Sequence, residues 1–230
     1  MATVPDNSAG TVPPLPPVPP GHAGCGPRCW RDAGAAPAAP EETRFRILFV
    51  CTGNICRSPL AERLTRSALG PCPAVEVTSA GTGAEWGRPM TERAQRVLTR
   101  FGGDPGGFRS RPLTPELVAA ADLVLTAASE HRARAVEMLP LAAARTFTLV
   151  EFGTLALAVP AEVVTCHRDA VHRARALVAE VRALRGLVRV DRPDIADPYG
   201  GRSRAYRVAG RRIAESLAVP LGLLTRSPGS

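Results

Sequence analysis

Residues 46–62 read RILFVCTGNICRSPLAE, and this stretch decides the expected fold. Its first five residues form a short continuous apolar run, which is typical of a strand buried on both faces of a parallel sheet. The following segment, SPLAERLTRSALG (58–70), places Leu60, Leu64 and Ala68 on one helical face, so we expect an amphipathic helix. Residues 51–57 then form a loop at the carboxyl end of the strand, where open α/β sheets bind their ligands.

The rest of the chain continues this alternation of strand and helix. Apolar runs predict further strands at 75–81, 122–126 and 145–150. Helical periodicity predicts helices at 90–103, 114–121, 129–139, 167–186 and 204–224. Strands that alternate with helices indicate a doubly wound parallel α/β sheet in one domain.

The N-terminal segment has a different composition. Residues 1–43 are rich in Pro, Ala and Gly and include PPLPPVPPG at 13–21. Such a segment cannot bury enough apolar surface to offset its ordering entropy, so we predict a disordered tail followed by a folded domain over 44–230.

Composition argues against several classes of protein. The net charge is +8 and all 29 basic residues are Arg, but no aromatic residues interleave with a basic stretch, so a nucleic-acid partner is not expected. No run approaches the ~18 apolar residues of a membrane span, and the N-terminus lacks a basic-then-apolar leader, so we expect a cytoplasmic protein with no membrane partner. Six unevenly spaced Cys fit free thiols better than a disulfide scaffold. Cys25 and Cys29 form half of a metal site without a second ligand pair, so no metal is expected.

The loop after the first strand carries residues suited to phosphate chemistry. A C-x5-R loop can curl so that its backbone N–H groups converge on one tetrahedral anion, at the positive end of the following helix. Arg57 would hold two phosphate oxygens, and Cys51 would lie in the same positive field, which favours its thiolate. Gly53 lets the backbone approach phosphate. Ser58 could cap the helix and offer a hydroxyl to the thiolate, and Pro59 suits the first helical turn.

Four motifs together resemble one family. The chain reads CTGNICRSPLAE at 51–62, SAGT at 79–82, ADLVL at 121–125 and DPYGG at 197–201. In this it is similar to the low-molecular-weight protein-tyrosine phosphatases over 46 to about 152 and 191–224. The resemblance implies a four-stranded parallel sheet flanked by helices. It also leaves 155–190 as an insertion with an extra helix.

The resemblance implies a role for each residue of the site. Cys51 is the nucleophile, Arg57 the phosphate clamp, and Asp197, which precedes Pro198, the general acid. Asp191 and Asp194 are nearby alternatives for the acid. The remaining loop residues are expected to bind or support the phosphate, without metal or cofactor: Thr52, Gly53, Asn54, Ile55, Cys56 and Ser58. Asn54 is expected to prop the loop through side-chain hydrogen bonds.

Residues at the pocket mouth indicate the phosphate ester. Ile55, Trp86 and Tyr199 would form an apolar and aromatic rim suited to a phenyl ring, which favours phosphotyrosine in a phosphoprotein substrate. The segments around SRPLTPELVAAADLVL and DPYGG instead resemble the branch that contains protein-arginine phosphatases, which carries Thr where this chain has Ile55. A protein-arginine phosphatase is therefore the alternative.

Other interpretations are weaker. An arsenate reductase of this fold needs a resolving Cys pair after the third strand, and 126–135 contains none. A non-catalytic phosphate-binding module would have lost part of the catalytic set. The resemblance also implies a reversible disulfide between Cys56 and Cys51, against the alternative of Cys56 as a buried core residue. His131, His167 and His172 are expected to be solvated helix residues.

Overall fold

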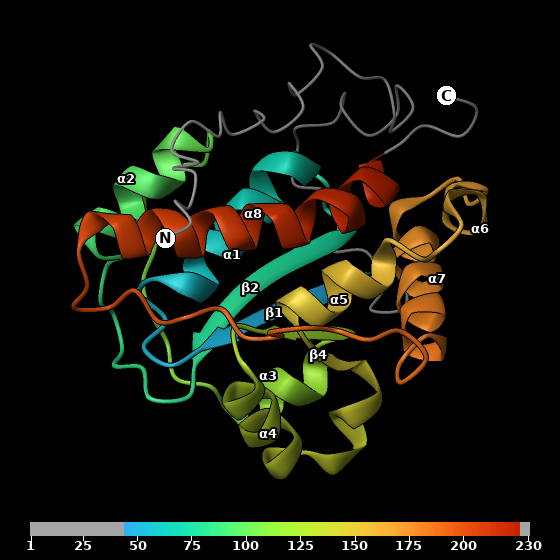
Figure 1. Ribbon diagram of the computed structural model, residues 1–230, viewed down its shortest axis with the longest axis horizontal. Coiled ribbons are helices and arrows are strands. Elements are labelled where there is room, and N and C mark those ends of the chain that lie inside the picture. The colour runs from blue at the N-terminus through green and yellow to red at the C-terminus, as the bar shows by residue number, and fades with distance from the viewer. Residues whose placement is uncertain (1–43, 226–230) are drawn as a thin grey trace, which may run out of the picture.

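The computed structural model describes residues 44–225, which form a four-stranded parallel sheet with helices on both faces (Figure 1). The strands are β1 (Phe45–Cys51), β2 (Val75–Gly81), β3 (Leu123–Thr126) and β4 (Thr146–Thr148), in the spatial order β2-β1-β3-β4. The predicted parallel α/β sheet is confirmed. The tail predicted at 1–43, with Cys25 and Cys29, lies outside the described residues.

The helices of the first half are α1 (Arg57–Leu69), α2 (Glu92–Arg100), α3 (Pro115–Ala120) and α4 (Ser129–Met138). A 3-10 helix, η2 (Pro140–Arg145), leads into β4. The helices of the second half are α5 (Leu149–Ala156), α6 (Ala161–Thr165), α7 (Ala170–Ala183) and α8 (Ser203–Thr225). No helix within residues 44–225 is long and apolar enough to cross a membrane.

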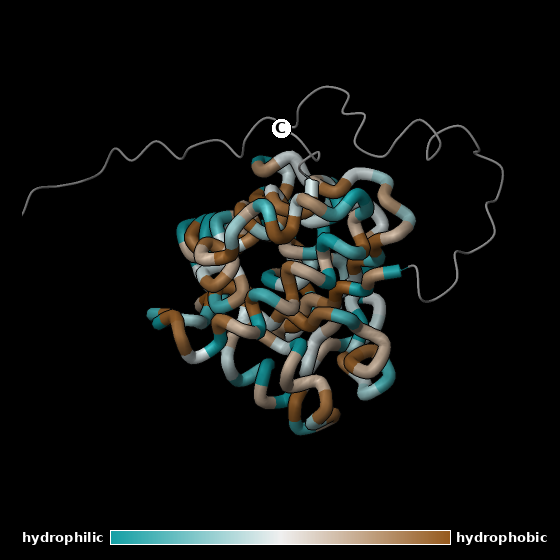
Figure 2. Tube along the Cα trace, turned by 90° about the vertical axis from the view of Figure 1, so that its right-hand side faces the viewer, coloured by the Kyte–Doolittle hydropathy of each residue, from teal (hydrophilic) through white to brown (hydrophobic). Residues whose placement is uncertain are grey.

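Alternate residues of β1 enter two different cores, because successive side chains of a strand point to opposite faces. Ile47 and Phe49 belong to the larger core, which α1, α2, α5, α7 and α8 cover. Leu48 and Val50 belong to a smaller core under α3 and α4. In Figure 2 brown hydrophobic stretches run through the middle of the trace, as this packing requires. The apolar run of β1 is therefore explained by burial on both faces.

One strand and one helix differ from their predicted ranges in ways that side-chain caps explain. The strand predicted at 145–150 ends at Thr148, and Leu149 begins helix α5, which the sequence analysis did not predict. Thr148 Oγ1 accepts a hydrogen bond from the backbone N–H of Glu151, and the Glu151 carboxylate accepts one from the N–H of Thr148. This capping box starts a helix inside the apolar run. The helix predicted at 167–186 is shorter, because Asp169 caps α7 through the N–H of His172.

The segment predicted to be an insertion, 155–190, packs into the main core. Val171, Leu177 and Val181 of α7 are buried in the same cluster as Phe152 of α5 and Leu217 of α8. The buried face of α7 therefore belongs to the same apolar core as Ile47 and Phe49 of β1. Its assignment as an insertion within one domain stays a prediction.

Candidate active site

The C-terminal end of β1 opens into a cavity of about 230 Å³. Cys51, the last residue of β1, lines it, although its side chain is only 2% exposed. β1 is central in the sheet, between β2 and β3, so the cavity lies at the carboxyl edge where the sequence predicted the site. Eleven residues line it: Cys51, Thr52, Gly53, Ile55, Cys56, Arg57, Gly83, Glu85, Arg88, Asp197 and Tyr199.

Asn54 lies in the loop between β1 and α1 and is completely buried. Its φ of 50° lies in the left-handed region, which Asn tolerates better than most residues. Its amide nitrogen donates to Ser58 Oγ at 2.9 Å and to Ser79 Oγ at 2.8 Å, and its Oδ1 accepts from the N–H of Arg111 at 2.9 Å. The three bonds join the loop to α1, to β2 and to the segment before α3. They are contacts of the kind that a propping role for Asn54 needs.

Ser58 Oγ lies 2.9 Å from Cys51 Sγ, within the first turn of α1. Ser58 Oγ accepts a hydrogen bond from Asn54 and has two possible acceptors for its one proton, Cys51 Sγ at 2.9 Å and the Ala80 carbonyl at 3.4 Å. The shorter of the two contacts places the Ser58 hydroxyl directly against the sulfur of Cys51. The predicted cap is wrong, however: Cys56 is the N-cap residue of α1, and no side chain caps it.

The backbone after β2 lies against the catalytic loop. The N–H of Thr82 donates to the carbonyl of Cys51 at 2.9 Å, and the N–H of Gly83 donates to the carbonyl of Thr52 at 3.0 Å. A Cβ on Gly81 would overlap the Thr52 carbonyl oxygen. The glycine of the SAGT motif is therefore required by this close approach.

Arg57 is 4% exposed and joins three parts of the site. Its Nη1 donates to the carbonyl of Ile195 at 3.1 Å. Its Nη2 donates to Thr52 Oγ1 at 3.1 Å and to Asp197 Oδ2 at 2.7 Å. The planar guanidinium is therefore held at the cavity by neutral groups, while one charged partner, Asp197, is 46% exposed.

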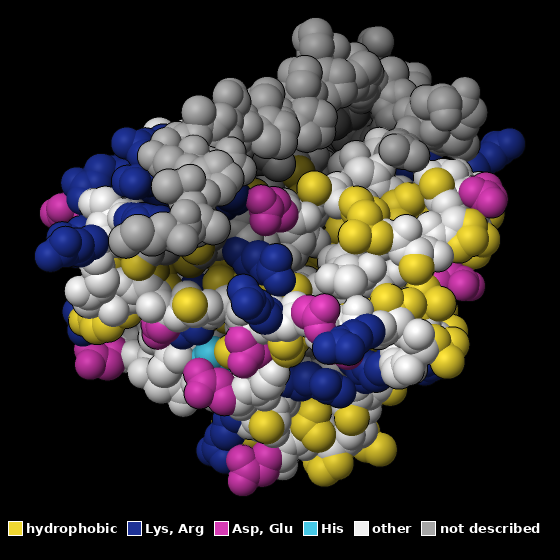
Figure 3. Space-filling model, viewed as in Figure 1, with side chains coloured by type: hydrophobic (Ala, Val, Ile, Leu, Met, Phe, Trp, Pro, Cys, Tyr) yellow, Lys and Arg dark blue, Asp and Glu magenta, His cyan; other side chains and the backbone are white. Residues whose placement is uncertain are grey.

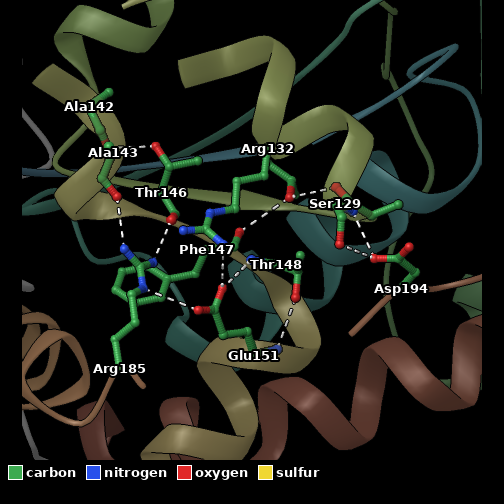
Figure 4. A network of polar contacts seen from close by, with 12 residues as sticks. Ser129, Arg132, Ala142, Ala143, Thr146, Phe147, Thr148, Glu151, Arg185 and Asp194 are labelled. Atoms are coloured by element: carbon green, nitrogen blue, oxygen red, sulfur yellow. Dashed lines mark hydrogen bonds and ion pairs between the residues drawn. The ribbon is translucent and has the colours of Figure 1, made fainter. Parts of the chain in front are cut away.

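The loop that carries Asp197 is fixed to the end of β3 and the start of α4. The N–H of Ile195 donates to the carbonyl of Ala127 at 2.8 Å. Asp194 Oδ1 accepts from both the N–H and the hydroxyl of Ser129, at 2.8 and 2.7 Å (Figure 4). Asp197 Oδ1 accepts from the N–H of Tyr199 at 3.1 Å. Helix α4 has Ala128 as its N-cap without a side-chain cap, so Asp194 caps it from another segment.

The two alternative acids are placed elsewhere. Asp191 pairs with Arg189 at 2.9 Å and is largely exposed. Asp194 is engaged with Ser129. Of the three carboxylates, Asp197 alone lines the cavity. The geometry favours Asp197, which the sequence singled out because Pro198 follows it.

The prediction for His131 is wrong, because this side chain is only 2% exposed. Its Nε2 lies 2.9 Å from Thr52 Oγ1, so it contacts the catalytic loop from α4. Burial, and then the charge of Arg57, lower its pKa, so the neutral imidazole is favoured. Sequence reasoning missed it because the contact joins residues far apart in the chain. Exposed His172, which pairs with Asp169 at 2.6 Å, agrees with its prediction.

Cys56 is a buried free thiol beside the loop. It is 5% exposed and belongs to the larger core, and its Sγ lies 3.4 Å from Thr91 Oγ1. Burial raises the pKa of this thiol above its ordinary value. Cys51 and Cys56 are both free, so the disulfide between them stays a prediction.

The rim of the cavity differs in part from the predicted one. Ile55 and Tyr199 line it, and Tyr199 is 63% exposed. Trp86 is 74% exposed in a turn and is not among the lining residues. Its neighbours Glu85 and Arg88 line the cavity instead, and they pair with each other at 2.8 Å. The sequence analysis did not predict Glu85 or Arg88 at the cavity, because it assigned the rim position in this turn to Trp86.

Comparison with known proteins agrees with this geometry. Residues 46–163 match the family described as low molecular weight phosphotyrosine protein phosphatase. The protein-arginine-phosphatase of Geobacillus stearothermophilus is 35% identical over 165 residues, 72% of this chain and 86% of the relative. The low molecular weight protein-tyrosine phosphatase A of Mycobacterium tuberculosis is 44% identical over 113 residues, 47% of this chain and 67% of the relative.

Solved structures show the same architecture. The YwlE arginine phosphatase from Geobacillus stearothermophilus superposes with a TM-score of 0.53 and 32% identity, over 78% of this chain and 90% of that one. A low molecular weight protein tyrosine phosphatase from T. tengcongensis gives a TM-score of 0.54 and 30% identity, over 77% and 96%. The chain therefore belongs to the low molecular weight phosphotyrosine protein phosphatase family.

Proposed function

We propose that this phosphatase hydrolyses phosphotyrosine in proteins through a phosphocysteine intermediate. One observation carries the proposal: Cys51 Sγ, hydrogen-bonded to Ser58 Oγ, shares one cavity with Arg57 and Asp197. A thiolate nucleophile, a cation for the equatorial oxygens and a proton donor are the three groups that phosphoryl transfer to a cysteine needs.

In the first step, the Cys51 thiolate attacks phosphorus, the S–P bond forms and the P–O bond to the tyrosyl ring breaks. Asp197 donates its proton to the departing oxygen. Arg57 and the backbone amides of the loop stabilise the charge on the equatorial oxygens. Arg57 must exchange its bond with Asp197 for one with phosphate, which also releases the carboxyl group for proton transfer.

In the second step, water attacks the phosphorus of the intermediate. Asp197, now a carboxylate, takes the proton of that water, the S–P bond breaks and inorganic phosphate leaves. The Ser58 hydroxyl stabilises the returning thiolate by donating to sulfur. Cys51, Arg57 and Asp197 line the cavity, and Ser58 reaches the reaction through its contact with Cys51.

The rim supports an aromatic ester. Ile55 is a partly buried residue of the loop, and Tyr199 is exposed in the segment that carries Asp197; both line the cavity. Stacking of a phenyl ring on Tyr199 and its burial against Ile55 would each favour phosphotyrosine.

Phosphoarginine is the second candidate, and a specific observation favours it. The arginine phosphatase of Geobacillus stearothermophilus matches 86% of its own length, whereas the match to tyrosine phosphatase A covers 67% of that relative. The longer match reflects similarity along most of the chain, whereas Ile55 is a single residue of the cavity. We give the pocket greater weight, because it contacts the leaving group.

The deciding experiment measures kcat/KM on two peptides of the same sequence, one phosphorylated on Tyr and the other on Arg. Cys51→Ser is the blank, since it keeps the cavity but removes the nucleophilic sulfur. A higher kcat/KM on phosphotyrosine supports the proposal. A higher value on phosphoarginine moves the assignment to the second candidate. If Cys51→Ser turns over substrate as fast as the wild type, Cys51 is not the nucleophile.

The free thiols support a cytoplasmic location for this reaction. All four cysteines of the described residues, including Cys51, are unpaired. A thiolate nucleophile stays active where cellular reductants keep it reduced. Phosphoproteins of the same compartment are the proposed substrates.

A further inference from the structure

Two neighbouring helices present a row of exposed arginines each. On α2 and α8 the residues are spaced three or four apart, which places each set on one helical face. They are Arg93, Arg96 and Arg100 on α2, and Arg204, Arg207 and Arg211 on α8. In Figure 3 dark blue side chains gather over α2 and the first turns of α8. We call these six residues the basic surface.

The two rows lie side by side. Helices α2 and α8 pack closely, because Gly210 of α8 lies directly on Val97 of α2, where a Cβ would overlap the valine side chain. The buried faces of both helices meet at this contact, and Tyr206 and Ala209 lie under it. The arginines therefore lie on the exposed faces of two helices that pack against each other.

The positive charge of this surface is largely unbalanced. Arg96 has one ion pair, with Glu92 at 3.9 Å, and both side chains are mostly exposed. Within residues 44–225 no carboxylate lies within ion-pair distance of the other five arginines. Like charges on neighbouring faces repel one another, so an acidic ligand would lower the free energy of the surface.

Both helices begin at the cavity. The N–H of Thr91, the N-cap of α2, donates to the carbonyl of Ile55 in the catalytic loop at 3.0 Å. Arg93 Nη1 donates to the carbonyl of Gly201 at 2.7 Å, two residues after Tyr199 of the rim. The basic surface therefore starts at the rim of the cavity and extends away from it.

Its length fits a short peptide. Each row covers eight residues of helix, and its two ends are about 10 Å apart at 1.5 Å per residue, which is the length of roughly three residues of extended chain. We propose that the basic surface binds acidic residues next to the phosphorylated residue of the protein substrate. The inference rests on the proposed phosphatase function and adds the charge of the substrate sequence to it.

A peptide fits this surface better than nucleic acid. The exposed residues of α2 and of the first half of α8 are Arg, Glu, Ser, Thr and Val, so the helices themselves offer no ring on which successive bases could stack, and the one exposed ring at their end, Tyr199, belongs to the cavity rim. The cavity lies at one end of the basic surface, so a ligand that occupies both must carry its acidic residues next to the phosphorylated residue.

The test compares two phosphotyrosyl peptides that differ only in three flanking residues, Glu in one and Gln in the other. The measured quantity is the ratio of their kcat/KM values at low ionic strength. Arg207→Gln/Arg211→Gln removes two charges from the basic surface. Arg168→Gln/Arg182→Gln, from exposed positions in the inserted segment, removes the same charge elsewhere and is the matched control.

For the wild type we expect a ratio of about 10 in favour of the acidic peptide, since several rim charges each add a small electrostatic term. The ratio should fall to roughly 2 in Arg207→Gln/Arg211→Gln and also in the wild type at 0.5 M salt. The control should keep the wild-type ratio. A wild-type ratio near 1, or an equal loss in the control, would overturn the proposal.

The same pair of peptides with phosphoarginine separates this inference from the proposed substrate. If only the phosphoarginyl peptides react, phosphotyrosine is the wrong substrate, and their acidic-to-neutral ratio still tests the basic surface. If a duplex oligonucleotide binds the wild type but not the double variant while both peptides react equally, the surface binds nucleic acid and the proposal is wrong.

Discussion

Arg57 Nη2 donates to Asp197 Oδ2 at 2.7 Å, so the proposed phosphate clamp and general acid bind each other directly. The two residues are 140 positions apart in the chain. A phosphate dianion that takes the guanidinium breaks this bond. In the proposed mechanism, substrate binding and release of the acid are therefore coupled through this hydrogen bond.

The first prediction concerns Asp197. Asp197→Ala removes the proton donor, so kcat on phenyl phosphate, with a poor leaving group, should fall by about 10²-fold or more. With para-nitrophenyl phosphate, whose leaving group needs less protonation, the loss should be several times smaller. Asp191→Ala, which removes an exposed carboxylate paired with Arg189, is the control. Equal losses on the two esters would point to another acid.

The second prediction concerns Asp194, which caps α4 and fixes the loop before Asp197. Asp194→Ala should destabilise the fold by about 1 kcal/mol, the usual cost of a lost cap. It should also lower kcat more for phenyl phosphate than for para-nitrophenyl phosphate, because the acid moves. Asp194→Asn keeps the oxygen that accepts from Ser129, so it should retain most of the wild-type stability and most of the wild-type kcat. A purely structural role would lower stability and leave the leaving-group dependence unchanged.

These contacts show where sequence reasoning succeeds. Cys51, Arg57 and Ser58 are close in the chain. Because β1 ends at Cys51 and α1 begins at Arg57, the short loop between them holds the three side chains near one another. The loop and its position at the sheet edge could therefore be predicted from one stretch. Asp197 could be found by resemblance, because Pro198 follows it.

Sequence reasoning failed where distant segments meet. His131 has polar neighbours in the sequence, and its burial results from contact with Thr52, 79 positions away. Helix α5 was missed because its apolar start resembles the continuation of β4. The signal was present in Thr148 and Glu151, whose spacing is that of a capping box.

The third prediction is a pH dependence at His131. Burial and Arg57 lower its pKa, while Glu130, Asp197 and Asp194 act in the opposite direction. The unfolded chain then binds the proton more readily than the folded protein, so stability should fall as the pH drops below the ordinary histidine value of about 6.5. His131→Gln cannot bind that proton. The stability difference between wild type and His131→Gln should therefore narrow from pH 7.5 to pH 5.5.

Urea unfolding at the two pH values measures this difference. His172→Gln is the control, because that side chain is 62% exposed. A difference between wild type and His131→Gln that stays constant with pH would show that protonation of His131 does not oppose folding.

The fourth prediction concerns Arg185, which follows α7 at the end of the inserted segment. Its guanidinium lies 3.8 Å from the ring centre of Phe147 and donates to the carbonyls of Ala143 and Thr146 and to Glu151 (Figure 4). Arg185→Ala should lower the free energy of unfolding by about 2–4 kcal/mol, from lost stacking and buried acceptors left without a donor. Arg185→Lys should recover only part, because an ammonium cannot make the planar contacts.

Chemical denaturation with Arg182→Ala, an exposed arginine of α7, as the control measures this loss. Equal stability of Arg185→Ala and Arg182→Ala would mean that the insertion is not held to the sheet by this contact. Glu151 keeps a weaker partner in Arg132 at 3.8 Å, so the loss should not reach that of an unpaired buried charge.

The fifth prediction concerns Ile55, the pocket residue at which the family resemblance divides. Ile55→Thr exchanges an apolar contact with the substrate ring for a hydroxyl, which the arginine-phosphatase branch carries. Burial of an aliphatic side chain is worth about 1.5–3 kcal/mol, so loss of part of that contact should lower kcat/KM on phosphotyrosine roughly tenfold. Turnover of the phosphoarginyl peptide should rise or stay unchanged. Ile55→Val, which keeps the branched shape without the hydroxyl, is the matched control and should retain the preference for phosphotyrosine. An equal preference in all three proteins would show that the framework, and not residue 55, selects the substrate.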